Sequence, residues 1–210
     1  MKVLVLATDE QKEELLAFPI HGDLNLIWGV AMNLEKDLLP VEACIDLLFE
    51  NNTERIEWLR QLQSPLVIVN AVIHTLEEIG DDFIRINGWN SFLKRPITEA
   101  ASRHKSLKEK AETLFSYFGR RVEWTPDIPG FITARVVVSI INEAFLALEE
   151  NVTVAKEIDI AMKLGTNYPY GPFEWGEKIG LTKVVSLLNT LTREQTRYKP
   201  SQLLKEKILV

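Results

Sequence analysis

The sequence predicts an α/β domain built on a mostly parallel sheet, followed by an all-α domain. Over residues 1–125, short β-branched runs alternate with helical patterns, as parallel strands joined through covering helices would. The segment Thr125–Gly130 then holds two prolines and a glycine, which neither a helix nor a strand tolerates. Beyond it no run is typical of a strand. The predicted domains are therefore residues 1–125 and 126–210.

Apolar periodicity places the elements of the first domain. Strands are expected at Val3–Leu6, Leu24–Trp28, Ile45–Phe49, Leu66–Val69, Phe83–Ile86 and Ile97–Ala100. Helices are expected at Asp9–Leu16, Thr53–Leu62 and Ser106–Phe118. Thr53 is the expected N-cap of the second helix, and Gly119 ends the third.

The second domain is expected to contain helices at Phe131–Glu150, Ala155–Leu164 and Thr182–Thr190. Gly165 is expected to end the second of them, and Tyr168–Trp175 to form a turn. The first helix is apolar around most of its circumference, so it needs burial on nearly all sides. A domain of about 80 residues has little interior to supply that burial alone.

Composition limits the classes of function. A hydrophobic fraction of 46% and a net charge of −6 over 210 residues are ordinary for a soluble protein and do not favour nucleic-acid binding. The apolar run Val3–Ala7 is too short for a signal peptide or a membrane span, so a cytoplasmic protein that does not bind membranes is expected. Cys44, the sole cysteine among the 210 residues, is expected to be buried. His21, His74 and His104 show no metal-ligand spacing.

Five segments of the second half occur in a recognisable order. They are Asp127–Arg135, Asn142–Ala144, Asp159–Gly165, Tyr168–Trp175 and Ile179–Leu181. This series resembles the C-terminal domain of 3-hydroxyacyl-CoA dehydrogenases, and fainter similarity extends upstream to Ala43–Glu50, Leu66–Asn70 and Ile86–Glu99. The resemblance implies a reduced Rossmann-like domain over 1–125, a helical domain over 126–210, and a homodimer through the helical domain. The motif residues themselves are of structural types, chiefly Pro and Gly, and say little about chemistry.

The resemblance implies an NAD site with a glycine-rich turn after the first strand. Its three glycine positions are Ala7, Asp9 and Lys12 here. Asp9 and Glu10 are expected to cap the following helix and to repel a pyrophosphate. The acidic residue for the ribose is missing, because the second strand ends in Trp28-Gly29. No cofactor is therefore expected, and no cofactor-binding or metal-binding residue is assigned.

The resemblance also implies a catalytic histidine oriented by a glutamate twelve positions later. Glu99 retains the glutamate, but Asn87 replaces the histidine. Val72 stands near the position of the family's serine, and Ala134 at that of its asparagine. His74, two residues from Val72, is a candidate substitute base; the alternative is a solvated histidine at the start of a helix.

Binding of CoA is a separate question from binding of NAD. The family's long helical excursion after the second strand is reduced to Gly29–Val41. Lys94-Arg95 and Arg120-Arg121 are candidate phosphate contacts; the alternative is solvated surface charge. An acyl-CoA-like small molecule is the expected ligand class.

Two main hypotheses follow, and they leave open whether the chain is an enzyme. The first is a catalytically impaired or inactive relative of these enzymes of fatty acid metabolism, with a role in ligand binding or dimeric interaction. The alternative is a functional oxidoreductase of the family with a rearranged active site, using His74 or Glu99. A third hypothesis is an interaction subunit that uses only the dimer face of the helical domain.

Overall fold

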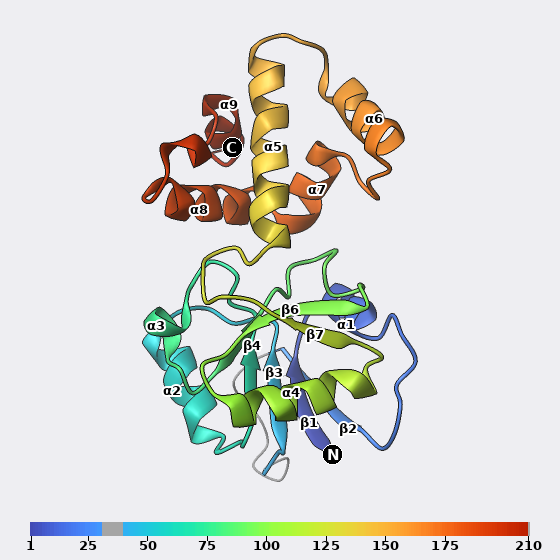
Figure 1. Ribbon diagram of the computed structural model, residues 1–210, viewed down its shortest axis with the longest axis vertical. Helices are drawn as coiled ribbons and strands as arrows, with labels where there is room; N and C mark the ends of the chain where they lie inside the picture. Colours follow the sequence, from blue (N-terminus) through green and yellow to red (C-terminus); the bar gives the residue numbers. More distant parts are fainter. Residues whose placement is uncertain (31–39, 210) are drawn as a thin grey trace. The chain divides into compact units, whose positions relative to one another are not determined.

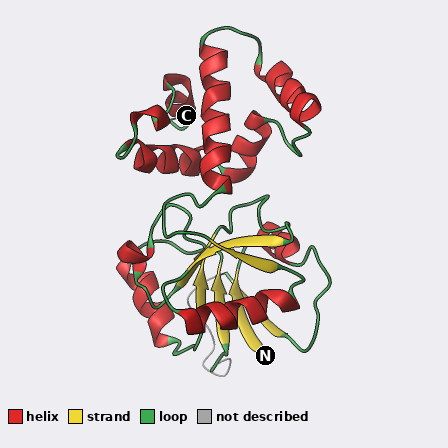
Figure 2. Ribbon diagram, viewed as in Figure 1, coloured by secondary structure: helices red, strands yellow, loops and turns green. Residues whose placement is uncertain are grey.

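The computed structural model describes residues 1–30 and 40–209. The chain divides into two compact units, Met1–Phe131 and Ile132–Val210 (Figure 1). The first unit combines strands and helices, and the described part of the second is helical without strands (Figure 2). This confirms the predicted fold class. The boundary predicted after residue 125 lies in the connection that precedes this division.

The sheet unit contains one sheet, which has seven strands within the described residues, in the order β2-β1-β3-β4-β5-β6-β7. The strands are β1 (Lys2–Leu6), β2 (Asn25–Gly29), β3 (Ala43–Asp46), β4 (Val67–Val69), β5 (Ile84–Ile86), β6 (Ile97–Ala101) and β7 (Arg121–Trp124). Strands β1 to β5 are parallel to one another. Strand β6 is antiparallel to β5, and β7 is parallel to β6. The sheet is thus mostly parallel, as predicted.

Side chains alternate between the two faces of the sheet, because successive residues of a strand point to opposite sides. The helices of this unit are α1 (Asp9–Leu15), α2 (Thr53–Gln61), α3 (Leu76–Ile79) and α4 (Lys105–Tyr117). Val3 and Ile45 belong to one core cluster with Leu114 and Phe115 of α4, which covers that face (Figure 1). The neighbouring residue Asp46 points the other way and contacts α2. Burial on both faces explains why these strands are continuous apolar runs.

The helical unit is arranged around its longest helix, α5. Its elements are α5 (Thr133–Glu149), α6 (Ala155–Thr166), α7 (Pro172–Ile179), α8 (Leu181–Thr192), the 3-10 helix η2 (Thr196–Tyr198) and α9 (Gln202–Lys207). Helix α5 packs against α7, α8 and α9. Asn142 on α5 is buried, accepts a hydrogen bond from the Ser201 amide at 2.8 Å and donates one to the Lys199 carbonyl at 3.1 Å. This side chain fixes the C-terminal segment against α5.

Two of the recognisable motifs meet at the start of α7. The Asp159 carboxylate accepts hydrogen bonds from the Phe173 and Glu174 amides at 2.8 and 3.3 Å, which caps α7 from α6. A Cβ at Gly171 would lie 2.2 Å from Asp159 Oδ1, so only glycine fits there. Lys163 forms an ion pair with Glu174. The spacing of these motifs therefore reflects contacts between α6 and α7.

Three expected helix ends are corrected by their caps. Helix α2 is capped by Asn52, whose Oδ1 accepts from the Arg55 amide at 2.8 Å, and not by Thr53. Helix α6 continues through Gly165, because Asn167 adopts the left-handed conformation that ends it. The expected turn Tyr168–Trp175 is correct only in its first part, since Pro172 begins α7.

The strands also differ from expectation in two places. Strand β3 begins at Ala43 and ends at Asp46, whereas the apolar run Ile45–Phe49 suggested a later strand. Strand β7 was missed, because its charged and apolar residues alternate in a short segment at the edge of the sheet. Cys44 is buried on β3 as expected, and burial raises the pKa of its thiol. Within residues 1–30 and 40–209, no helix is both long and apolar enough to cross a membrane.

Candidate functional site

The candidate site lies at the edge of the sheet where strands β1 to β5 end. Parallel α/β sheets place ligands at this edge. Asn70, directly after β4, donates from Nδ2 to the carbonyls of Leu47 (3.1 Å) and Gly88 (3.2 Å). Its Oδ1 accepts from the Gly88 amide at 2.9 Å. Asn70 thus joins the ends of three neighbouring strands and positions the segment that carries Asn87.

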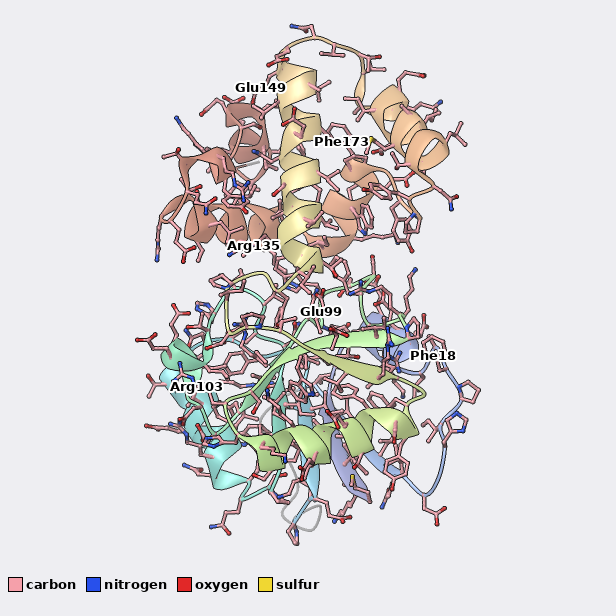
Figure 3. The ribbon with its side chains drawn as sticks, viewed as in Figure 1. Phe18, Glu99, Arg103, Arg135, Glu149 and Phe173 are labelled. Carbon is pink, nitrogen blue, oxygen red and sulfur yellow. The ribbon has the colours of Figure 1, made fainter. Side chains whose placement is uncertain are left out.

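Asn87 and Glu99 form a buried pair between β5 and β6. Asn87 Nδ2 donates to Glu99 Oε2 at 3.0 Å, and the Asn87 amide donates to the Glu99 carbonyl at 3.0 Å. Both side chains are buried, and Figure 3 labels Glu99 on β6. A carboxylate only accepts hydrogen bonds, so the amide must turn its nitrogen toward it. Asn87 Oδ1 therefore faces away, and this buried atom has no hydrogen-bond partner among the described residues.

His74 belongs to a different group of side chains. Its Nδ1 lies 3.1 Å from Asn51 Nδ2 and 3.7 Å from Glu78 Oε2. The side chain is 40% exposed and stands just before Thr75, the N-cap of α3. The structure therefore brings Asn87 and Glu99 together, and it engages His74 with the residues that follow β3 and with α3.

The two remaining family positions are apolar and buried. Val72 follows β4, and its backbone carbonyl accepts hydrogen bonds from Arg85 and Gly130. Ala134 lies in the first turn of α5. Both side chains are almost fully covered. Neither position can offer the hydroxyl or amide group that the family resemblance would require.

The first turn of α1 is closed by its own residues. Thr8 Oγ1 accepts from the Gln11 amide at 3.2 Å, and Gln11 Oε1 accepts from the Thr8 amide at 3.0 Å. This capping box corrects the expectation that Asp9 and Glu10 cap the helix, although both carboxylates do lie exposed in its first turn. Lys12 lies over the ring of Trp28, with Nζ 4.8 Å from the centroid. The residues present do not fit a pyrophosphate, which needs open backbone amides and no nearby carboxylate.

Of the proposed phosphate contacts, Arg120 is excluded by its burial. Within the described residues, its guanidinium donates hydrogen bonds to backbone carbonyls, including those of Leu93 at 2.6 Å and Leu15 at 2.7 Å. Burial lowers its pKa to about 10. Arg120 is a structural cation that ties α1 to the segment after β5. Arg95 is also half-buried and stacks on Phe92, with Cζ 4.9 Å from the ring centroid.

Two ion pairs that involve buried arginines were missed by sequence reasoning. Arg55 on α2 forms a bidentate pair with Asp46 at 2.6 and 2.7 Å. Arg85 lies within β5 and pairs with Asp127 at 2.7 Å. A charged residue inside an apolar strand was the available signal for Arg85, because such a charge must be paired when buried. In the part of the chain that the structure describes, no group of three or more His, Cys, Asp or Glu could hold a metal ion.

The comparisons agree with this architecture. The family model "3-hydroxyacyl-CoA dehydrogenase, C-terminal domain" matches residues 130–209. The 3-hydroxyadipyl-CoA dehydrogenase of Escherichia coli is 39% identical over 116 residues, which are 54% of this chain and 24% of that protein. The 3-hydroxybutyryl-CoA dehydrogenase of Clostridioides difficile is 30% identical over 182 residues, 82% of this chain and 60% of that protein. The matched part thus spans less than two thirds of either curated relative.

A solved structure shares the fold across nearly the whole chain. The crystal structure of (S)-3-hydroxybutyryl-CoA dehydrogenase from Ralstonia eutropha superposes with a TM-score of 0.75 at 18% identity, covering 99% of this chain and 93% of that one. Its fold, the match to the helical unit and the two relatives all point to one family. The chain belongs to the 3-hydroxyacyl-CoA dehydrogenase family.

Proposed function

We propose that this chain is a member of the family that binds a small acyl ligand without oxidising or reducing it. The observation that carries the proposal is the Asn87–Glu99 pair, which keeps the carboxylate but holds an amide where a base would stand. An amide does not take up a proton at neutral pH, so a hydroxyl bound there would keep its proton. General acid–base catalysis of about 10²–10⁴-fold would be lost at this step alone.

The first turn of α1 supports the same proposal. A pyrophosphate would meet the exposed carboxylates of Asp9 and Glu10 at the end of the helix where anions normally bind. The amides of Thr8 and Gln11 are already engaged in the capping box. NAD binding is therefore expected to be weak or absent, and no hydride-transfer step is derived for this chain.

The class of ligand follows from the side-chain oxygen of Asn87. Asn87 Oδ1 is a buried acceptor, and a buried acceptor is stabilised by a donor such as a hydroxyl group. We expect an acyl ligand with a hydroxyl on its chain to bind better than the same ligand without it. A neutral hydrogen bond is worth about 0.5–1.5 kcal/mol, or roughly 2- to 10-fold in affinity.

A thermal-shift titration tests the proposal, because a ligand that binds only the folded state raises the melting temperature. The ligands are 3-hydroxybutyryl-CoA, butyryl-CoA and NADH. We expect a larger shift with the hydroxylated acyl-CoA than with butyryl-CoA, and none with NADH. Asn87→Ser should reduce the difference between the two acyl-CoAs, whereas Asn90→Ser in the same segment should preserve it. A shift with NADH alone would favour the alternative, an oxidoreductase with a rearranged site.

We also propose that the helical unit forms a homodimer. Ile132 and Val136 stand one turn apart at the start of α5 and are 56% and 53% exposed. Val136 lines a groove of about 590 Å³ whose lining mixes apolar residues such as Ile140 and Leu146 with the charged Arg135, Glu143 and Arg197. Helix α6 has no buried residue at all, and Leu164 on it is 83% exposed. A second copy of this chain would cover apolar surface that a single copy leaves in water.

A further inference from the structure

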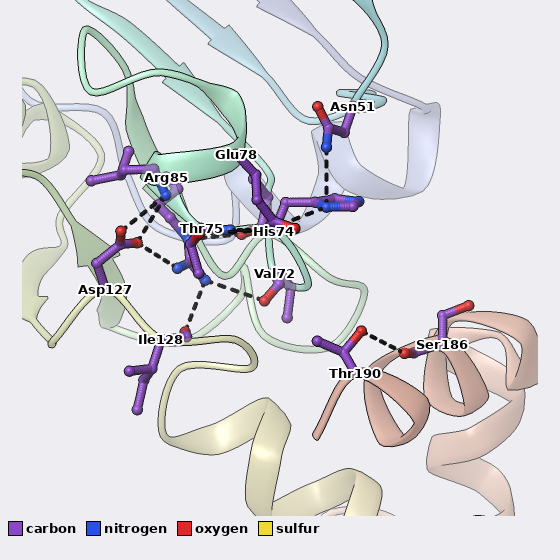
Figure 4. A network of polar contacts seen from close by, with 12 residues as sticks. Asn51, Val72, His74, Thr75, Glu78, Arg85, Asp127, Ile128, Ser186 and Thr190 are labelled. Atoms are coloured by element: carbon purple, nitrogen blue, oxygen red, sulfur yellow. Dashed lines mark hydrogen bonds and ion pairs between the residues drawn. The ribbon is translucent and has the colours of Figure 1, made fainter. Parts of the chain in front are cut away.

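Arg85 is a fully buried cation with partners in two separate segments. Its Nε donates to the Ala71 carbonyl at 3.0 Å, and Nη2 donates to the Val72 carbonyl at 3.2 Å. On the other side, Nη2 donates to the Ile128 carbonyl at 3.1 Å, and Nη1 donates to Asp127 Oδ1 at 2.7 Å (Figure 4). One side chain thus joins the segment after β4 to the connection that leads out of the sheet unit.

The same two segments are also bonded directly to each other. The Asp127 carboxylate accepts from the Leu76 amide through both oxygens, at 3.1 and 3.0 Å. In return, the Gly130 amide donates to the Val72 carbonyl at 2.8 Å. Arg103 adds a longer ion pair to Asp127 at 3.7 Å. The contacts therefore form a closed network, with Arg85 at its centre.

Phe131, the last residue of the sheet unit, packs against the Arg85 guanidinium. Its ring is buried and lies 4.3 Å from Arg85 Cζ. Gly130 and Phe131 both have positive φ, at 83° and 49°. A non-glycine residue adopts this conformation only where the surroundings fix it. The network thus fixes the backbone up to Phe131, which is also where the sheet unit ends.

A buried arginine makes such a network depend on every partner. Burial lowers the pKa of Arg85, yet a guanidinium stays charged in proteins. A buried charge is tolerated only when its hydrogen bonds are satisfied, and removing one partner strongly disfavours the arrangement. The Arg85 guanidinium therefore needs both segments at once, and their positions are coupled.

We propose that Arg85 is a positioning residue that locks the segment Ala71–Leu76 and the connection Asp127–Phe131 into one rigid element. The first segment carries Val72 and His74, two positions singled out in the sequence, and the second leads into the helical unit. Movement of the helical unit must then be accommodated after Phe131. This inference goes beyond the proposed function and requires no ligand, so it stands or falls separately.

Amide hydrogen exchange measured by NMR on the full chain tests the proposal. The probes are the Leu76 and Gly130 amides, each bonded to the other segment. In Arg85→Met, which keeps an unbranched apolar side chain but removes the guanidinium donors, both amides should exchange about tenfold faster or more, as loss of a charge-assisted hydrogen bond implies. The Cys44 amide, bonded to the Leu66 carbonyl within the sheet, should keep its rate.

The matched control is Arg55→Met, which breaks the ion pair of the other buried arginine, Arg55–Asp46. It should accelerate the Leu48 amide, which donates to Asp46, and leave Leu76 and Gly130 unchanged. If Arg85→Met does not fold, Asp127→Ala decides by the Gly130 amide alone, because the Leu76 amide loses its own acceptor in that variant. Unchanged rates at Leu76 and Gly130 in the folded variant, or equal acceleration by Arg55→Met, would overturn the proposal.

Discussion

Asn87 donates its side-chain amide to the Glu99 carboxylate at 3.0 Å, across the antiparallel pair β5–β6. The two residues are twelve positions apart in sequence, and their backbones are also joined by the bond from the Asn87 amide to the Glu99 carbonyl. Glu99 holds the Asn87 side chain by a hydrogen bond, as it would hold a catalytic histidine, but the amide of Asn87 cannot accept a proton. Under the proposed function, this position serves to bind a ligand and does not transfer a proton.

Restoring the histidine alone should not restore activity. In Asn87→His, the imidazole would again have Glu99 beside it, but Val72 and Ala134 would still offer no polar contact. Catalytic residues act as a unit, so a single repair recovers little. We expect no oxidation of NADH with acetoacetyl-CoA, measured by absorbance, in Asn87→His or in the control Asn90→His. Turnover by Asn87→His alone would show that the cofactor site is competent.

Two glycines near the α6–α7 junction should respond in opposite ways to alanine. Gly171→Ala places a Cβ 2.2 Å from Asp159 Oδ1, and overpacking of this kind destabilises by about 1–3 kcal/mol. At Gly165, within α6, a Cβ meets nothing within 4 Å, so alanine should stabilise by about 0.5–1 kcal/mol through helix propensity. Urea denaturation of both variants measures this. Equal effects at the two positions would contradict the role assigned to Asp159.

The proposed dimer should depend on the exposed end of α5. Val136→Glu places a charge on a surface that the proposed dimer would cover, and an unpaired charge in an interface weakens association by several kcal/mol. We expect a dimeric mass for the wild type at micromolar concentration by sedimentation, and a monomeric mass for this variant. Val30→Glu, an equivalent change at an exposed valine of the sheet unit, should stay dimeric. A monomeric mass for the wild type would contradict the proposed dimer.

The pH dependence of stability should carry a contribution from Glu14. Burial raises the pKa of this carboxyl above its ordinary value of 4.5, against the opposing effect of the Ser91 amide that bonds it. A folded-state pKa above the unfolded one means that protonation favours the folded state. Relative to Glu14→Gln, the wild type should therefore gain stability as pH falls from 7 to about 4. Denaturation of both proteins at the two pH values measures it, and a relative loss would contradict the sign.

Local patterns predicted much of this fold. The apolar runs at Val3–Leu6 and Leu66–Val69 become buried strands, since burial on both faces leaves an unmistakable signal. The proline-rich segment Thr125–Gly130 marks the connection between the units. Helix ends were less predictable, because Asn167 rather than Gly165 takes the left-handed cap, and either residue can do so.

The contacts that hold the site together could not be predicted. Arg85 and Asp127 are 42 residues apart, and Arg120 bonds the carbonyl of Leu15 from 105 residues away. No local periodicity reports on such pairs. The spacing of Asn87 and Glu99 was recognisable only by resemblance. The amide orientation that leaves the buried Oδ1 without a hydrogen-bond partner among the described residues needed the geometry.

The central claim is tested most directly by wild-type turnover. The measurement is NADH oxidation with acetoacetyl-CoA at neutral pH, at enzyme concentrations high enough to detect a residual rate. We expect no rate above the buffer control, because the position of the base holds an amide and the first turn of α1 carries carboxylates where a pyrophosphate would lie. Robust, saturable turnover by the unaltered chain would contradict the account.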